Sequence, residues 1–382
     1  MSRVLVISFS DLGRDARVER QIEFLSTRHE VVAAGLGPPR REDVEFVDLR
    51  PPALTGARRQ LGRAVLALRL LARRSESAYW GVPLHRGARE ALEGVRADLV
   101  LANDVEALPI AAHVGDGAPV VFDAHEWAPA QYEHVRWWPL LMRPQVEALL
   151  REHLPRVAGM MTVAPGIAER YESRYGVRCY VVTNAAPRAA LHPTPPHEPI
   201  RLLHHGGAQP ERRLELMIEA VRQLDGQATL DLVLLPTNKA YLRRLKALAE
   251  GDERIRFLDP LPIEQLTAEA NDYDAGVIFY PPLHANLELS LPNKLFDFLQ
   301  ARLGLVIGPS PEMARIVREF DCGVVAPDFT LAALVETIRE LSAPRIAALK
   351  QGADRAAAVH NAENNRDVVL RMVDDALATA ER

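Results

Sequence analysis

Short apolar runs alternate with longer amphipathic segments along the whole chain. In the first half, runs rich in Val, Ile and Leu fall at 4–7, 31–34, 99–102, 120–122, 160–163 and 180–182. Segments such as 16–26 and 166–175 lie between them and repeat their apolar residues with the period of a helix. Near-continuous apolar strands separated by helices are typical of a parallel sheet that is covered on both faces. The pattern therefore predicts an α/β fold with doubly wound parallel sheets.

This alternation breaks once, at 187–199, where five of thirteen residues are proline. Proline lacks an amide hydrogen and fixes its backbone, so the segment is predicted to be a linker. Beyond it, strands are expected at 201–204, 231–235, 255–257, 275–280, 305–307 and 324–325, and helices at 213–224, 241–249, 263–270, 292–301, 311–319 and 331–341. The predicted domains are 1–186 and 200–360, followed by a helical tail at 361–382 for which packing back on the N-terminal domain is one possible arrangement.

The composition of the 382 residues excludes several classes of protein. Hydrophobic residues make up 48% of the chain and the net charge is −5, so two full cores are expected, and there is no overall basic field to attract nucleic acid. The two cysteines, Cys179 and Cys322, are too few for a disulfide framework or a zinc cluster. With no leader pattern and no apolar stretch of about 18 residues, we expect a cytoplasmic protein that at most contacts the inner face of the membrane.

The loops that follow strands are where ligands bind in parallel sheets, often at helix N-termini. The first such loop contains Gly13, which permits a tight turn, followed by Asp15 and Arg17. It lacks the G-x-G-x-x-G pattern, so a nicotinamide oxidoreductase is weakly supported. Asp15 and Arg17 fit a charge pair at a helix start as well as they fit contacts to an acceptor.

A histidine between acidic residues follows the apolar run at 120–122, in the order Asp123, Ala124, His125 and Glu126. Such a histidine can orient a sugar hydroxyl or assist proton movement, so His125 and Glu126 are the candidate catalytic residues. A histidine that is satisfied by loop backbone is the alternative. No second histidine completes an H-E-x-x-H motif, and no metal site is expected.

The segment 286–297 is the most informative loop, because it enters a predicted helix with Pro292 near the first turn. The free backbone N–H groups and the positive dipole end at such a helix start favour a diphosphate. Lys294 in the first turn is unfavourable for the dipole alone, which points to an anion nearby. Asp297, about one turn further, can accept hydrogen bonds from a ribose diol. A purely structural helix start is the alternative.

A glycine pair, Gly206 and Gly207, follows the first strand of the second half, and Arg212 and Arg213 come shortly after it. Glycines permit close approach of backbone to a ligand, and arginine pairs with phosphate. Together with the segment 286–297, these residues predict a diphosphate pocket in the C-terminal half.

Taken in order, these motifs resemble GT-B glycosyltransferases of the large retaining family 4. The stretch 15–18, Asp-Ala-Arg-Val, is similar to the start of the family's first helix, and 123–126 is similar to its D-x-H-E segment. Thr183 and Asn184, followed by Pro187, resemble its interdomain turn, and 291–298 resembles its P-N-K stretch. The resemblance covers nearly the whole chain. It implies two Rossmann-like domains facing across a cleft, and transfer of a sugar from a nucleotide diphosphate sugar to an acceptor hydroxyl, with retention and without a metal or other cofactor.

The resemblance also implies roles for individual residues. Arg212 or Arg213, with Lys294, would neutralise the diphosphate, and Asp297 would take the ribose hydroxyls. The N-terminal domain, including Gly13 and His125, would hold the reacting sugar and the acceptor, which could be a glycan, a lipid-linked glycan or a small molecule. The family's paired glutamates stand eight positions apart, whereas Leu289 and Asp297 stand at those positions here. Contacts to the sugar are therefore left to Asn286, Glu288 or Ser290, and Asn293 is a further candidate for donor binding.

Two other functions remain open at this point. One is a chain of the same fold that binds nucleotide sugars but has lost turnover, which a donor hydrolysis assay would distinguish. The other is a sugar-nucleotide epimerase, which shares the fold but needs further acidic and histidine groups beside the sugar.

Two segments raise the question of peripheral membrane contact. Residues 56–74 contain six arginines and no acid, and at about 100° per residue these arginines fall on one half of a helix, opposite Leu61, Val65, Leu68 and Leu71. A domain helix with a solvated basic face is the alternative. Residues 127–142 contain three tryptophans, which fit an acceptor entrance or bilayer contact as well as core packing.

Overall fold

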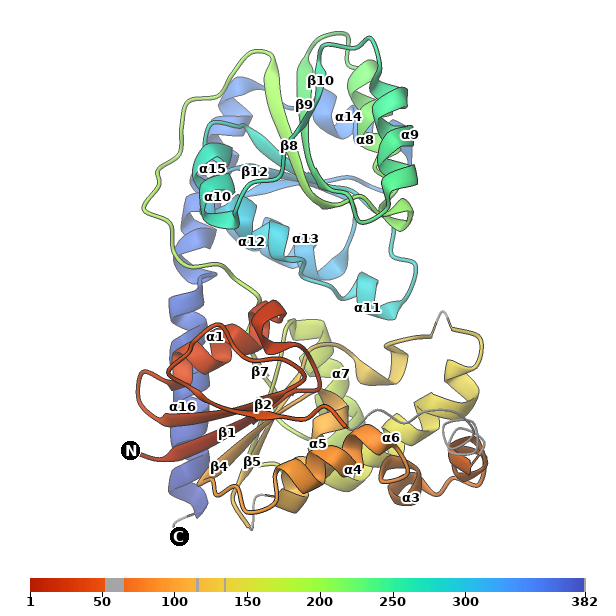
Figure 1. Ribbon diagram of the computed structural model, residues 1–382. Helices are drawn as coiled ribbons and strands as arrows, with labels where there is room; N and C mark the ends of the chain where they lie inside the picture. Colours follow the sequence, from red (N-terminus) through yellow and green to blue (C-terminus); the bar gives the residue numbers. More distant parts are fainter. Residues whose placement is uncertain (52–64, 115–116, 134, 381–382) are drawn as a thin grey trace. The chain divides into compact units, whose positions relative to one another are not determined.

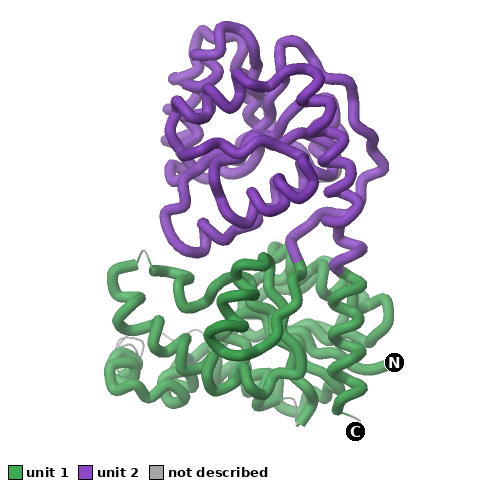
Figure 2. The backbone as a smooth tube through the Cα atoms, turned by 180° about the vertical axis from the view of Figure 1, so that it is seen from behind, with its two compact units in different colours: residues 1–182, 366–382 green, residues 183–365 purple. Residues whose placement is uncertain are grey.

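The computed structural model describes residues 1–51, 65–114, 117–133 and 135–380 (Figure 1). They form two compact units, which are coloured separately in Figure 2. Unit 1 comprises 1–182 and 366–382, and unit 2 comprises 183–365. The proline-rich segment 187–199 thus groups with unit 2, whereas the sequence treats it as a separate linker.

Unit 1 contains a seven-stranded sheet in the order β3-β2-β1-β4-β5-β6-β7. Its paired strands are all parallel. The strands are β1 (Arg3–Ile7), β2 (Glu30–Gly35), β3 (Glu45–Asp48), β4 (Leu99–Asn103), β5 (Val120–Ala124), β6 (Gly159–Thr162) and β7 (Tyr180–Val181). The helices are α1 (Ala16–Leu25), α3 (Ser75–Tyr79), α4 (Pro83–Ala91), α5 (Asp104–Val114), α6 (Arg143–His153), α7 (Pro165–Tyr175) and α16 (Ala362–Ala380), of which the part from Arg366 onward belongs to this unit. The described part of the unit also contains the short helices η1 (Leu12–Arg14), η2 (Ala128–Ala130), η3 (Trp138–Met142) and η4 (Leu154–Arg156).

The centre of this sheet is buried on both faces, as the continuous apolar runs predict. Every residue of β4 is buried, and so are Val4 to Ile7 of β1. The strand order changes direction between β1 and β4, so the loops after these two strands diverge at the carboxyl edge of the sheet. That is the point where ligands bind in doubly wound folds.

The last helix, α16, packs on unit 1 through its second half. Gly159 of β6 lies so close to Met372 that an added Cβ would come within 2.9 Å of its Cγ. Arg28 forms an ion pair with Asp374 at 3.1 Å. These contacts fix the C-terminal helix against the unit that contains the N-terminus.

Unit 2 contains a six-stranded parallel sheet in the order β10-β9-β8-β11-β12-β13. The strands are β8 (Ile200–Gly207), β9 (Ala228–Leu235), β10 (Ile255–Leu258), β11 (Ala275–Ile278), β12 (Gly304–Ile307) and β13 (Gly323–Val325). The helices are α8 (Glu215–Arg222), α9 (Lys239–Ala249), α10 (Ile263–Ala270), α11 (Ala285–Glu288), α12 (Asn293–Gln300), α13 (Pro311–Phe320), α14 (Leu331–Arg339) and α15 (Ala343–Val359), with the short η5 (Pro210–Arg212). Helices α8, α9 and α14 cover one face, and α10, α12 and α15 cover the other (Figure 1).

The proline-rich segment runs along unit 2 and is held there by the residues between its prolines. The amide of Ala189 donates to Gln300 Oε1 at 3.0 Å, and Thr194 Oγ1 donates to the carbonyl of Asn271 at 2.8 Å. Because proline cannot donate a backbone hydrogen bond, the intervening residues make these contacts.

The predicted fold class is confirmed, since both units are α/β with parallel sheets. Several details differ. The edge strand β3 was not predicted, the first strand of unit 2 extends to Gly207, and the helical stretch after 345 is two helices that are interrupted near His360. Among the described residues, no helix is long and apolar enough to cross a membrane.

Half of the predicted basic helix, including Arg58, Arg59 and Arg63, lies outside the described residues. Residues 65–71 are helical. Leu70 is buried there, whereas Leu68 and Leu71, which belong to the predicted apolar face, are 65% and 64% exposed.

The three tryptophans of 127–142 have different environments. Trp138 is buried, and Trp127 packs edge-on against Tyr171 with ring centroids 4.8 Å apart. Trp137 is 61% exposed. Packing within unit 1 therefore accounts for two of the three.

Candidate functional site

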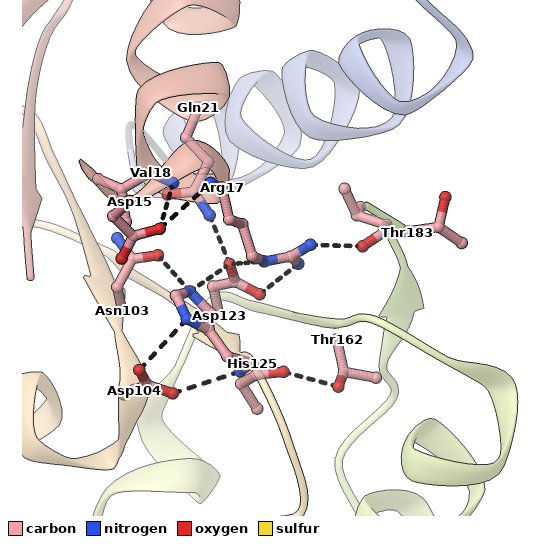
Figure 3. A network of polar contacts seen from close by, with 12 residues as sticks. Asp15, Arg17, Val18, Gln21, Asn103, Asp104, Asp123, His125, Thr162 and Thr183 are labelled. Atoms are coloured by element: carbon pink, nitrogen blue, oxygen red, sulfur yellow. Dashed lines mark hydrogen bonds and ion pairs between the residues drawn. The ribbon is translucent and has the colours of Figure 1, made fainter. Parts of the chain in front are cut away.

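Each unit carries a cluster of buried and half-buried polar residues at the carboxyl ends of its central strands. The cluster of unit 1, drawn in Figure 3, consists of Arg17, Gln21, Asn103, Asp104, Asp123 and His125. The cluster of unit 2 consists of His204, His205, Arg212, Tyr280, Lys294 and Asp297.

Asp123 is the fully buried centre of the unit 1 cluster. Arg17 donates from Nε to Oδ2 and from Nη2 to Oδ1, each at 2.6 Å, and Gln21 also donates to Oδ2. Although burial alone would raise the pKa of Asp123, the charges of Arg17 and His125 hold it well below its usual range. Asp123 is therefore a permanent carboxylate that ties α1 to β5.

His125 has a hydrogen-bond acceptor at both ring nitrogens. Its Nε2 lies 3.2 Å from Asp123 Oδ2 and 3.1 Å from Asn103 Oδ1, while Nδ1 lies 3.3 Å from Asp104 Oδ2. Burial opposes the charged ring, but the carboxylates of Asp104 and Asp123 raise the pKa of His125 to about 9. The ring is therefore an imidazolium at neutral pH, which can stabilise negative charge but cannot accept a proton.

Asp104 is a member of this cluster that sequence reasoning missed. It follows β4 directly and adopts φ of 62°, a left-handed conformation that residues with a side chain rarely take. Its side chain is 39% exposed, in contrast to the fully buried Asp123. A backbone held in this region at a strand end is typical of functional sites. The only signal in the sequence is the Asn-Asp pair after the apolar run at 99–102.

The other residues predicted for unit 1 occupy structural positions. Asp15 caps α1, because its Oδ1 accepts from the amides of Arg17 and Val18 at 3.1 and 3.2 Å. All three guanidinium nitrogens of Arg17 bond within the unit, including Nη1 to the carbonyl of Val182 at 2.7 Å. The helix-start interpretation thus accounts for Asp15, and the buried ion pair to Asp123 accounts for Arg17.

Gly13 and Glu126 border the same edge of the sheet. The amide of Gly13 donates to the carbonyl of Pro38 at 3.1 Å, and an added Cβ would lie 3.0 Å from that oxygen. Glu126 is half-buried, and its carbonyl accepts from the Tyr171 hydroxyl at 3.1 Å. The catalytic role predicted for Glu126 stays a prediction.

In unit 2, Lys294 is buried at the second position of α12, where Pro292 is the N-cap residue. Its Nζ lies 3.2 Å from His204 Nε2, and His204 Nδ1 lies 2.7 Å from the carbonyl of Val277. A carbonyl can only accept, so Nδ1 carries the hydrogen and Nε2 accepts from the lysine.

Lys294 and Arg212 converge on Gly206. At this glycine, with φ of 131°, an added Cβ would come within 3.0 Å of both Lys294 Nζ and Arg212 Nη1. The same two cations lie 5.7 and 5.8 Å from the ring centroid of Tyr280. Burial lowers the pKa of Lys294 well below its usual value, and Arg212 lowers it further. Two basic side chains held together beside a bare backbone form a site that an anion would stabilise.

Asp297 lies one turn further along α12 and is buried. Its Oδ2 is 3.4 Å from His205 Nε2, without hydrogen-bond geometry. Burial, with the charges of Lys294 and Arg212, lowers the pKa of His205 to about 3, so this histidine is neutral. The structure thus brings Asp297 to the same strand end as the two cations.

The residues in and after α11 that were predicted to contact the donor differ in their exposure. Asn286 is buried, whereas Glu288 is exposed and its carbonyl accepts from Ser310 Oγ at 3.4 Å. Ser290 Oγ donates to the carbonyl of Leu287 at 2.8 Å, which caps the end of the short helix.

Three other residues that were predicted to bind the nucleotide diphosphate sugar lie near Lys294 and Arg212. Gly207 lies against Thr237, whose Oγ1 would be 3.1 Å from an added Cβ. Asn293 is exposed at the first position of α12, and Arg213 is exposed in a left-handed conformation. Of the two arginines, Arg212 is the one that meets Lys294.

No group of three or more His, Cys, Asp or Glu side chains in the described part of the chain is arranged to hold a metal ion.

No protein-family model matches this sequence, and no curated protein matches it at a significant level. The structure, in contrast, is similar to solved glycosyltransferases over almost its whole length. HepE from Anabaena, solved with UDP and glucose, has a TM-score of 0.66 at 14% identity, with 98% of this chain and 100% of HepE covered. A glycosyltransferase from Rickettsia africae has a TM-score of 0.67 at 11% identity, with 98% of each chain covered. Sucrose-phosphate synthase from Thermosynechococcus elongatus has a TM-score of 0.66 at 14% identity, with 99% of each chain covered.

At identities this low, the likeness is informative about the fold. The predicted GT-B fold is thereby confirmed for this chain.

Proposed function

We propose that this protein is a glycosyltransferase that moves a sugar from a nucleotide diphosphate sugar to an acceptor hydroxyl, with retention of anomeric configuration and without a metal ion. The fold is compatible with many chemistries, so the proposal has to rest on the site. The function is argued from the two polar clusters, one for each unit.

The observation that carries the proposal is the convergence of Lys294 and Arg212 at Gly206. The diphosphate of a donor supplies the negative charge that this pair of cations lacks, and the missing side chain at Gly206 leaves room for its oxygens. The start of α12 adds backbone N–H groups and the positive end of the helix dipole. HepE, one of the structural neighbours, was solved with UDP and with UDP-glucose, which favours UDP as the first nucleotide to test.

Asp297 is proposed to bind the ribose of the same donor. A carboxylate one helical turn beyond the phosphate-binding lysine can accept hydrogen bonds from two neighbouring hydroxyls. The half-buried or buried polar side chains of Asn286 and Ser290 are proposed to contact the sugar.

Unit 1 is proposed to bind the reacting sugar and the acceptor at the cluster around His125. The His125 imidazolium would stabilise negative charge that develops on the reacting groups bound at this cluster. In this role His125 acts as a fixed charge and does not remove a proton. The acceptor is proposed to be a glycan, a lipid-linked glycan or a small molecule, and peripheral membrane contact through 56–74 and 127–142 belongs to the lipid-linked case.

Donor turnover tests this function. The protein would be incubated with UDP-glucose and other nucleotide sugars in EDTA, and the anomeric proton of the product would be followed by NMR. Release of nucleoside diphosphate with a product of unchanged anomeric configuration is expected. Binding without any turnover would indicate an inactive nucleotide-sugar-binding protein, and interconversion of the sugar without release of nucleotide would indicate an epimerase.

A further inference from the structure

Lys294 is an unusual phosphate ligand, because the free protein buries it beside another cation. Its side chain is 5% exposed, and Arg212 Nη1 and Lys294 Nζ would both contact an atom placed at the Cβ position of Gly206. Asp297 is the acidic group that acts on the amine, and its carboxylate lies instead 3.4 Å from His205. Burial and the guanidinium of Arg212 therefore both favour the neutral amine in the absence of a ligand.

His204 provides the amine with a partner that suits either protonation state. The carbonyl of Val277 fixes the hydrogen on Nδ1, which leaves the Nε2 lone pair 3.2 Å from Lys294 Nζ. Both a neutral amine and an ammonium can donate to this lone pair. His204 is fully buried, and burial together with the charge of Lys294 lowers its pKa well below the usual value, so the ring does not compete for the proton.

We propose that His204 is a positioning residue for the donor phosphates, and that its neutral Nε2 holds the Lys294 amine in place while that amine takes up a proton as the diphosphate binds. This inference rests on the proposed function of the unit 2 cluster. The proton comes from solvent, the new N–H bond forms at Nζ, and no other bond is made or broken. Binding of a nucleoside diphosphate is then coupled to uptake of one proton by the protein.

The coupling predicts the sign of a pH effect. Protonated Lys294 binds the phosphates and the neutral amine does not. The affinity for the nucleoside diphosphate should therefore fall as the pH rises through the pKa that Lys294 has in the ligand-free protein. For one linked proton, the fall approaches about tenfold per pH unit. The charged or titratable groups facing Nζ are His204 and His205 of β8, Arg212 of η5, Tyr280 after β11, and Asp297 of α12. Of these, His204 can be changed without removing a proposed contact to the ligand.

Two substitutions separate positioning from mere packing. His204→Gln keeps an acceptor at the position of Nε2, whereas His204→Leu keeps the bulk and removes it. Without an acceptor the ammonium is less stable, so the pKa of Lys294 should fall and the loss of affinity should begin at a lower pH in His204→Leu. His204→Gln should retain the wild-type profile. His192→Gln, the same change at an exposed histidine of unit 2, is the matched control and should have no effect.

The experiment is isothermal titration calorimetry with UDP between about pH 6.5 and about pH 9.5, each in two buffers of different ionisation enthalpy. Phosphate groups, with a pKa near 6, are fully ionised over the upper part of this range, so proton uptake there belongs to the protein. We expect net proton uptake by the wild-type protein, none by Lys294→Met, and an affinity profile shifted to lower pH in His204→Leu alone. If His204→Leu does not fold, the uptake by the wild-type protein still decides whether binding is coupled to a proton, and a wild-type profile in His204→Gln beside a shifted one in His204→Ala decides the role of His204.

UDP binding with no proton uptake and a flat profile would overturn this inference and leave the proposed function intact. If the affinity for UDP depends on pH in the same way in His204→Leu and His204→Gln, His204 is not a positioning residue. Absence of binding of UDP and the other nucleoside diphosphates at every pH would contradict the proposed function itself, and this inference with it.

Discussion

Replacing Asp123 with asparagine should destabilise unit 1 strongly. Asp123 Oδ2 accepts from Arg17, Gln21 and His125, and Oδ1 accepts from Arg17 Nη2. The NH2 group of an asparagine would therefore face hydrogen-bond donors in either orientation of its amide. The substitution also leaves Arg17, which is 8% exposed, as a buried charge without a carboxylate. Removing one partner of a buried ion pair costs about 3–5 kcal/mol, and we expect Asp123→Asn to fall in this range.

The tryptophans make this effect measurable for unit 1 alone. All four, Trp80, Trp127, Trp137 and Trp138, belong to unit 1, so tryptophan fluorescence during urea denaturation follows the unfolding of that unit. The matched control is Asp48→Asn, which changes an exposed carboxylate paired with Arg50 at the edge strand β3 and should leave the midpoint nearly unchanged. A cost below about 1 kcal/mol for Asp123→Asn, or equal midpoints for the two variants, would refute the assignment of Asp123 as the centre of the cluster.

Three further predictions concern the two clusters. Asp297→Ala should weaken UDP binding by about 1.5–3 kcal/mol, the range for a hydrogen bond to a charged group, as measured by calorimetry; unchanged affinity would exclude the ribose contact. His125→Ala should lower kcat by about 100-fold or more while donor affinity changes little, and steady-state kinetics with normal kcat would exclude a role at the reacting centre. Because the pKa of His125 is raised from the usual 6.5 to about 9, its contribution to stability is complete below about pH 6.5 and is lost as pH rises to about 9, which corresponds to about 3 kcal/mol. Urea titrations across this range should show the loss in the wild-type protein and not in His125→Asn.

Most of the elements of unit 2 could be predicted because its apolar runs are bounded by residues that end helices and strands. The predicted helix at 292–301 is α12, with Pro292 as its N-cap residue, and the strand expected at 305–307 is β12. At these positions the hydrophobic pattern and the residues that begin or end helices indicate the same structure, and such elements can be predicted.

Two of the elements that were missed, α5 and β3, lack such a pattern. Helix α5 is apolar on most sides and contains Pro109, so its sequence has no amphipathic period. Strand β3 has four residues, Glu45 to Asp48, of which none is buried. Its place in the sheet comes from pairing with β2, and a half-exposed edge strand carries little hydrophobic signal.

The chemistry of the site was predictable where one local motif carries it. Lys294 and Asp297 follow from a helix start with a cation in its first turn. The partners that set their properties come from distant strands: His204 reaches Lys294 because β8 pairs with β11. Asp104, with its left-handed backbone, likewise lies where β4 passes directly into α5. Such pairings depend on strand order, which the sequence pattern alone does not determine.

Binding of nucleoside diphosphates tests the central claim most directly. Thermal unfolding would be followed with UDP, GDP, dTDP and CDP in EDTA, for the wild-type protein and for Lys294→Met. A ligand that binds only the native state stabilises that state by RT ln(1 + [L]/Kd) and so raises the unfolding temperature. The account predicts that at least one diphosphate stabilises the wild-type protein without metal and that the effect is lost in Lys294→Met. If none of the four does so, or if Lys294→Met is stabilised equally, the assignment of the unit 2 cluster as a donor site is contradicted.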